Sequence, residues 1–214
     1  MSIICLEGAS AVGKSTTCKA FARRYHTYVV PETSELFKAP GLQDKPLSKW
    51  LLDRQIDRWS IAREQSLKYD YVILDGDIFK LWYDWVFGDS GLTVQEQGEL
   101  FRDKIIQQEI AFPDAYVALW IDEEQLRARR EADSSRTRKN FTKHLHMVKP
   151  QLKYFTFLQG LIPGYVGIHN ATSVESNVDF MFQHLQQTPD IIGKQVEIFD
   201  QILHFYDTHQ ADQY

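Results

Sequence analysis

Short apolar runs alternate with longer segments of helical periodicity along this chain of 214 residues. The apolar runs contain few polar positions, which is typical of strands that are covered on both faces of a parallel sheet. The predicted strands are Ile3–Leu6, Thr27–Val30, Tyr71–Leu74, Tyr116–Ile121 and Tyr165–His169. Because strands and helices alternate, the pattern predicts an α/β fold with a mainly parallel five-stranded sheet and helices on both faces.

Seven segments place apolar residues at the spacing of a helix face. They are Lys14–Arg24, Ser48–Lys68, Val94–Ile110, Glu123–Arg130, Phe141–Leu158, Val174–Gln187 and Ile191–Thr208. Pro150 should kink or split the fifth of them, because proline lacks the N–H that a helix interior needs. The last one is expected to pack on the others and close the fold. The predicted loops at 37–47 and 87–93 do not resemble linkers, so we expect a single domain over residues 1–214.

The overall composition argues against several classes of protein. A formal net charge of −5 disfavours nucleic acid as the main partner. The two cysteines, Cys5 and Cys18, are too few for a disulfide framework and are expected to be reduced thiols. The N-terminus lacks a charged-then-apolar signal pattern, and no apolar run approaches the ~20 residues that span a bilayer. We expect a soluble cytoplasmic protein without a membrane partner.

Residues 8–15, GASAVGKS, match the phosphate-binding pattern G-x-x-x-x-G-K-[ST] at every required position, between a predicted strand and a predicted helix. The two glycines let the backbone curl so that N–H groups and the helix dipole face a phosphate. Lys14 is expected to reach the β- and γ-phosphates of ATP, and the Ser15 hydroxyl to bind Mg²⁺. The alternative is a glycine-rich turn before an ordinary helix. The predicted nucleotide-binding residues of the loop are Gly8, Ala11, Val12, Gly13, Lys14, Ser15 and Thr16.

Acidic residues follow two of the predicted strands, at the edge of a parallel sheet where ligands bind. Glu32 is a candidate general base for an attacking hydroxyl, and a helix N-cap is the alternative. Asp75 ends four apolar residues, as in a Walker B motif, and is expected to reach Mg²⁺ directly or through water. Gly76 allows a tight turn, and Asp77 supplies a second carboxylate near substrate or metal. Either Glu32 or Asp77 is the predicted base.

Six of the fourteen residues from 126 to 139 are basic, although the chain as a whole is acidic. Arginines that close over a transferring phosphoryl group stabilise its charge, so we expect a lid at about 126–140. Arg130 and Arg136 are the predicted catalytic residues, and Arg127 and Arg138 the predicted nucleotide contacts. A solvated basic helix face or a nucleic-acid patch is the alternative.

The aromatic region from about 48 to 90 is the predicted acceptor site. Arg54, Arg58 and Trp82 are its candidate substrate contacts, since aromatic rings beside arginines suit a planar acceptor. A hydrophobic core or a homodimer interface is the alternative for most of these rings. Beyond the fifth strand, Asn170 is a candidate contact to the adenine, whereas Thr172 or Ser173 suits a helix N-cap.

Together, these motifs resemble the P-loop nucleoside and nucleoside-monophosphate kinases over about residues 1–185. The Val-Val-Pro-Glu stretch at 29–32 is similar to deoxynucleoside kinases, in which an acid at this position is the catalytic base. The segment 51–77 is more similar to thymidylate kinases, and Arg54 matches their base-contacting arginine. Both groups carry an arginine after the strand-end acid, where this chain has Gly76. The resemblance implies a three-layer P-loop kinase fold with an arginine-rich lid.

We therefore expect an ATP- and Mg²⁺-dependent kinase that transfers the γ-phosphoryl group to a small acceptor. Nucleosides and nucleoside monophosphates are the leading acceptors. Because Gly76 replaces the arginine, an antibiotic or sugar kinase is an alternative. A regulatory ATPase without a small acceptor is the alternative from another class, but it needs neither the lid nor the acceptor pocket that the sequence predicts.

Overall fold

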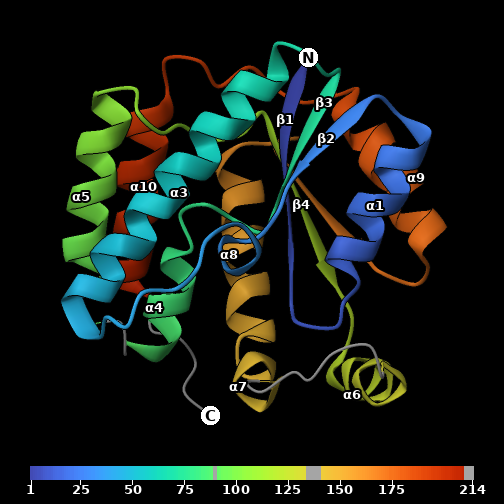
Figure 1. Ribbon diagram of the computed structural model, residues 1–214, viewed down its shortest axis with the longest axis horizontal. Coiled ribbons are helices and arrows are strands. Elements are labelled where there is room, and N and C mark those ends of the chain that lie inside the picture. The colour runs from blue at the N-terminus through green and yellow to red at the C-terminus, as the bar shows by residue number, and fades with distance from the viewer. Residues whose placement is uncertain (89–90, 134–140, 210–214) are drawn as a thin grey trace.

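Five parallel strands form the centre of the computed structural model, which describes residues 1–88, 91–133 and 141–209. Their order across the sheet is β2–β3–β1–β4–β5, so β1 lies in the middle (Figure 1). The strands are β1 Ser2–Gly8, β2 Thr27–Val30, β3 Tyr71–Asp75, β4 Ala115–Trp120 and β5 Val166–Asn170. The predicted parallel sheet and α/β class are confirmed, and every strand lies within two residues of its predicted bounds.

Helices cover both faces of the sheet, and the side chains of β1 alternate between the two cores. Ile4 and Leu6 are buried toward α1 and α9, whereas Ile3 and Cys5 are buried toward α3 and α8. On the second side, α5 and α10 pack on each other, as expected for a last helix that closes the fold. These helices are α1 Lys14–Arg24, α9 Val174–Leu185, α3 Asp44–Ser66, α8 Val148–Leu161, α5 Val94–Ile106 and α10 Gln195–Thr208. Among the described helices, none combines the length and apolar character that crossing a membrane requires.

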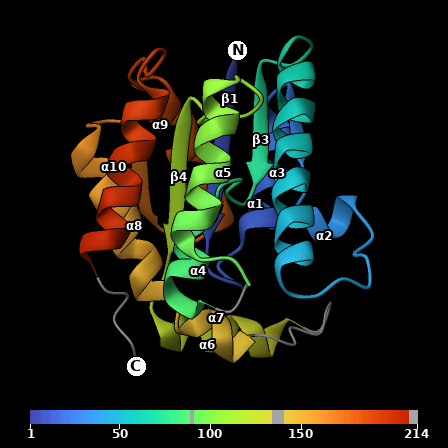
Figure 2. The same ribbon diagram turned by 90° about the vertical axis from the view of Figure 1, so that its left-hand side faces the viewer.

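Short helices gather at the carboxyl end of the sheet. In Figures 1 and 2, α4, α6 and α7 lie at the end of the molecule opposite the N-terminus, beyond the ends of the strands. The short helices are α2 Thr33–Leu36, α4 Leu81–Phe87, α6 Glu123–Ala132 and α7 Phe141–Leu145. They surround the edge at which a parallel sheet binds ligands.

The helix predicted over 141–158 is split, but not at Pro150. The helix is interrupted between Leu145 and Val148, and Pro150 lies in the first turn of α8. Its missing N–H costs nothing there, because N–H groups of the first turn have no partner within the helix. The sequence pattern did not predict α4, and α3 begins inside the expected loop, at Asp44.

Candidate functional site

The segment between β1 and α1 curls in the way that the G-x-x-x-x-G-K-S pattern predicts. Gly8 and Gly13 have φ angles of 151° and 108°, and Ala11 has a φ of 74°. A Cβ atom on Gly8 would lie 2.3 Å from the carbonyl oxygen of Leu119 on β4, so this position requires glycine. Gly13 is the N-cap of α1, and its carbonyl accepts the N–H of Thr17 at 2.9 Å. The loop therefore presents backbone N–H groups and a helix N-terminus at the carboxyl edge of the sheet.

A cavity of about 960 Å³ lies at this edge, within the range of small-molecule sites. It brings together the phosphate loop, the ends of β2 and β3, and residues of α4, α6 and α7. Most of the predicted loop residues line it, whereas Val12 is buried beneath the loop. The predicted residues that line the cavity are Gly8, Ala11, Gly13, Lys14, Ser15, Thr16, Glu32, Asp75 and Trp82.

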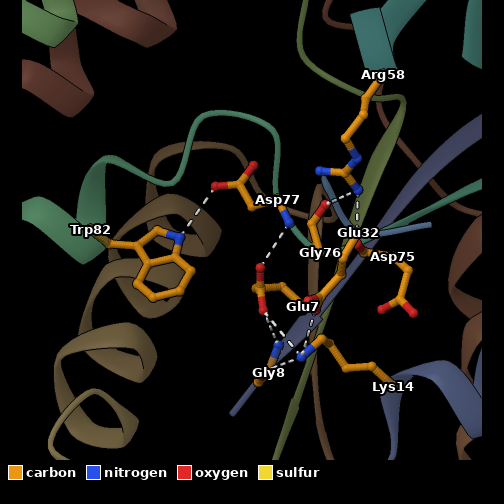
Figure 3. A network of polar contacts seen from close by, with 9 residues as sticks. All are labelled: Glu7, Gly8, Lys14, Glu32, Arg58, Asp75, Gly76, Asp77 and Trp82. Atoms are coloured by element: carbon orange, nitrogen blue, oxygen red, sulfur yellow. Dashed lines mark hydrogen bonds and ion pairs between the residues drawn. The ribbon is translucent and has the colours of Figure 1, made fainter. Parts of the chain in front are cut away.

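The ammonium of Lys14 lies among carboxylates. Its Nζ donates a hydrogen bond of 2.7 Å to the carbonyl of Gly8 and lies 3.7 Å from Glu32 Oε1 and 3.8 Å from Glu7 Oε1 (Figure 3). Burial alone would lower the pKa of Lys14, but Glu7, Glu32 and Asp75 together raise it above its ordinary value. Lys14 is therefore a fixed positive charge at neutral pH, with the Glu32 carboxylate beside it.

Ser15 and Asp75, the predicted metal ligands, are adjacent in the structure. The Ser15 hydroxyl donates a hydrogen bond to Asp75, although burial has the larger effect and raises the pKa of this carboxyl. Asp75 Oδ1 is buried without a hydrogen-bond partner among the described atoms, as expected of an oxygen that awaits a cation. The described residues contain no group of three or more His, Cys, Asp and Glu side chains arranged to hold a metal. The pair therefore fits a Mg²⁺ ion that takes its other ligands from phosphate and water.

Glu7 is a member of the site that the sequence analysis did not identify. Its side chain is only 3% exposed. Oε1 accepts the N–H of Gly8 at 2.7 Å, and Oε2 accepts the N–H of Asp77 at 2.7 Å (Figure 3). One carboxylate thus ties the first residue of the phosphate loop to the turn after β3. An acidic residue in an otherwise apolar strand was the available signal.

Asp77 lies behind the cavity wall, contrary to the prediction that placed it beside substrate or metal. Its carboxylate is fully buried and accepts hydrogen bonds from the N–H groups of Phe79 and Lys80, Trp82 Nε1 and the Tyr116 hydroxyl. Burial, and then the charge of Glu7, raise the pKa of Asp77, while its donors oppose this. These contacts give Asp77 the role of fixing the turn that follows β3.

Arg58 is also buried, although it was predicted to contact substrate. Its guanidinium donates to the carbonyls of Pro31, Asp75 and Gly76, which end β2 and β3, and to Gln55 Oε1. Burial lowers the pKa of Arg58. The cation therefore holds the two strand ends together, and Figure 3 shows its contacts with Asp75 and Gly76.

The other predicted contacts lie in different places. Trp82 lines the cavity, and its indole is oriented by Asp77. Arg54 pairs with Asp57 at 2.8 Å on α3, with its guanidinium over the rings of Phe37 and Trp50, and it does not line the cavity. Asn170 is exposed at the end of β5, also outside the cavity lining.

Of the described arginines on α6, Arg129 is the one that faces the phosphate loop. It donates to the carbonyls of Val12, at 2.9 Å, and of Ala171, and so joins the loop to the turn after β5. Arg127 is exposed and pairs with Glu123, and Arg130 lies over the ring of Phe141. Arg136 and Arg138 lie outside the described residues, as does most of the lid predicted at 126–140. The orientation of α6 therefore turns Arg129 toward the phosphate loop, and the sequence analysis had not singled out this arginine.

The strand order, the curled loop and the cavity define a P-loop nucleoside kinase-like fold. No protein-family model and no curated protein matches the chain. Among solved structures, the chain is similar to deoxyadenosine kinase from M. mycoides with bound dATP. The similarity has a TM-score of 0.52 and 12% identity, and it covers 86% of this chain and 99% of that one. It shows the fold and confirms the fold that the motifs predicted.

Proposed function

We propose that this protein is an ATP- and Mg²⁺-dependent phosphotransferase that phosphorylates a small hydroxyl acceptor, with nucleosides as the leading class. The main support is the distance of 3.7 Å between Lys14 Nζ and Glu32 Oε1 in one cavity. This distance supports a role for Lys14 as a cation that binds the γ-phosphate and for Glu32 as a carboxylate that serves the acceptor. The fold of a deoxyadenosine kinase supports the nucleoside class.

In the proposed reaction, Glu32 accepts the proton of the acceptor hydroxyl. The acceptor oxygen forms a bond to the γ-phosphorus as the bond to the β,γ-bridging oxygen breaks, and ADP leaves. Lys14 holds the phosphates, Ser15 and Asp75 hold Mg²⁺, and Trp82 borders the acceptor. Mg²⁺, when bound, neutralises charge on the phosphates. Because such transition states are loose, positioning and electrostatic stabilisation supply most of the acceleration.

Lid arginines complete the proposal. Arg129 orders the phosphate loop through the Val12 carbonyl. Arg127, Arg130, Arg136 and Arg138 remain proposed sources of positive charge over the transferred group. Arg54 and Asn170 remain proposed contacts to acceptor and adenine.

The test is a phosphoryl-transfer screen with ATP and MgCl₂ against nucleosides, nucleoside monophosphates, aminoglycosides and sugars. The panel extends beyond nucleosides because Gly76 replaces the arginine of nucleotide kinases. We expect at least one hydroxyl compound to stimulate ADP release and to gain a phosphate. A folded protein whose ATP turnover no compound stimulates would contradict the kinase proposal and favour a regulatory ATPase.

Matched variants make the screen specific to the site. Lys14→Ala should lower turnover by about 100-fold or more, because a cation on the transferring group is lost. Glu32→Gln should lower it by about 100-fold or more while nucleotide affinity stays near wild type. Lys68→Ala, which removes a lysine paired with Glu64 far from the cavity, should leave turnover unchanged. Wild-type turnover in Lys14→Ala would contradict the proposal that phosphoryl transfer takes place at this phosphate loop.

A further inference from the structure

Lys80 lines the same cavity as Lys14, and the sequence motifs gave it no role. A Cβ atom built on Gly76 would lie 3.4 Å from Lys80 Nζ, 3.5 Å from Glu32 Oε1 and 3.6 Å from Glu7 Oε2. An ammonium and two carboxylates therefore converge on the position that a side chain at Gly76 would enter. Glu32 Oε1 is also 3.7 Å from Lys14 Nζ, so the ammonium groups of Lys14 and Lys80 both lie near Glu32 in this cavity.

The backbone of Lys80 is held in a conformation that side chains rarely adopt. Its φ is 49° and its ψ is 21°, in the left-handed region, which costs a non-glycine residue about 1–2 kcal/mol. Asp77 Oδ2 accepts the N–H of Lys80 at 3.1 Å, and the Lys80 carbonyl accepts the N–H of Tyr83 at 2.9 Å. A buried carboxylate thus fixes the turn that directs Lys80 into the cavity.

The ammonium of Lys80 is available for a ligand. Within the described parts of the chain, no hydrogen bond or ion pair involves Lys80 Nζ, whereas the Lys14 ammonium is hydrogen-bonded to Gly8. His144, which also lines the cavity, does not add a competing cation. Burial, and then the charges of Lys14 and Lys80, lower its pKa.

We propose that Lys80 is a catalytic residue that binds the γ-phosphoryl group of ATP together with Lys14. The assignment rests on the proposed phosphotransferase function. The Lys80 ammonium supplies a second positive charge in the cavity beside that of Lys14. Two ammonium groups then flank the transferred group, on which negative charge is spread in the transition state.

The test compares the affinities of ADP and of the non-hydrolysable analogue β,γ-imido-ATP, both with MgCl₂, by isothermal titration calorimetry. Lys80→Met should weaken binding of the analogue by about 10–100-fold, the loss of one charge-assisted contact, while ADP affinity changes less than about twofold. The matched control Lys68→Met should change neither affinity.

Lys80→Gly separates ligand binding from any effect on folding. Glycine adopts a φ of 49° without steric cost, so this variant should keep or raise the melting temperature while losing the same affinity for the analogue. Unchanged analogue affinity, or equal weakening of ADP and analogue, would overturn the assignment. If the wild type bound neither compound, the nucleotide-binding half of the proposed function would fail as well. A wild type that prefers the analogue, with the preference intact in both Lys80 variants, would overturn the role of Lys80 alone.

Discussion

Glu7→Gln should destabilise the protein and weaken nucleotide binding together. Both carboxylate oxygens of Glu7 accept buried backbone N–H groups at 2.7 Å, from Gly8 and Asp77. A glutamine keeps the size of the side chain but replaces one acceptor oxygen with an NH₂ group. This NH₂ would face a backbone N–H, so that one buried donor would lose its acceptor.

The two hydrogen bonds of Glu7 set the size of the expected loss of stability. A buried donor without an acceptor costs about 1–3 kcal/mol, and the remaining hydrogen bond loses about 1 kcal/mol when its acceptor loses its charge. Removing a buried carboxylate charge offsets part of this. After this offset, we expect the free energy of unfolding to fall by about 1–3 kcal/mol and the melting temperature to fall by roughly 2–12 °C.

Urea unfolding, followed by tryptophan fluorescence and by far-ultraviolet circular dichroism, measures the change in stability, and calorimetry with ADP measures binding. Glu64→Gln is the control, because Glu64 is exposed and its carboxylate pairs with Lys68, and it should change stability by about 0.5 kcal/mol or less. If Glu7→Gln stayed within that range and bound ADP like the wild type, the reasoning from its two hydrogen bonds would be refuted.

Two further predictions concern other parts of the fold. Arg129→Met should cost roughly 1–3 kcal/mol in unfolding free energy and weaken ADP binding, because the carbonyls of Val12 and Ala171 lose their donor. The control is Arg24→Met, because Arg24 forms an exposed ion pair with Asp179; it should lower the free energy of unfolding by about 1 kcal/mol or less. Equal effects of the two variants would contradict the prediction. Glu96 has a pKa of about 2, below its usual 4.5, because Lys45 and the N–H of Thr93 bond its carboxylate. Its stabilisation is therefore present above about pH 4.5 and lost as the pH falls toward 2, so the melting temperatures of wild type and Glu96→Gln should converge on acidification; a constant difference would refute this.

The sequence predicted the sheet and the phosphate loop because each depends on local chemistry. The apolar run at Tyr71–Leu74 and the glycines at 8 and 13 dictate a buried strand and a curled loop whatever surrounds them. Helix α4 was not predicted because its sequence, LWYDWVF, is apolar nearly all round and has no clear face.

The roles of individual arginines depend on tertiary structure and could not be predicted in the same way. Arg127, Arg129 and Arg130 lie on one short helix but point in different directions, and the contacts of α6 with the rest of the fold turn Arg129 toward the phosphate loop. Arg54 and Arg58 are one helical turn apart, yet the second reaches the carbonyls that end β2 and β3 while the first is partly exposed. Only the position of the sheet beside each helix separates a structural arginine from a candidate ligand contact.

The polar residues around the cavity form two layers, and the layers should respond differently to substitution. Asp77 and Arg58 hydrogen-bond to backbone groups behind the wall, so their loss should lower stability and ligand affinity together. Lys80 and Glu32 face the cavity from turns that other residues hold in place, so their loss should change ligand binding or turnover with little effect on stability. Glu7 belongs to both layers, because it lines the cavity and also bonds the two backbones that shape it. Gly76 lies between the two layers: its φ of 87° favours glycine, and a Cβ there would lie within 3.6 Å of Lys80 Nζ, Glu32 Oε1 and Glu7 Oε2.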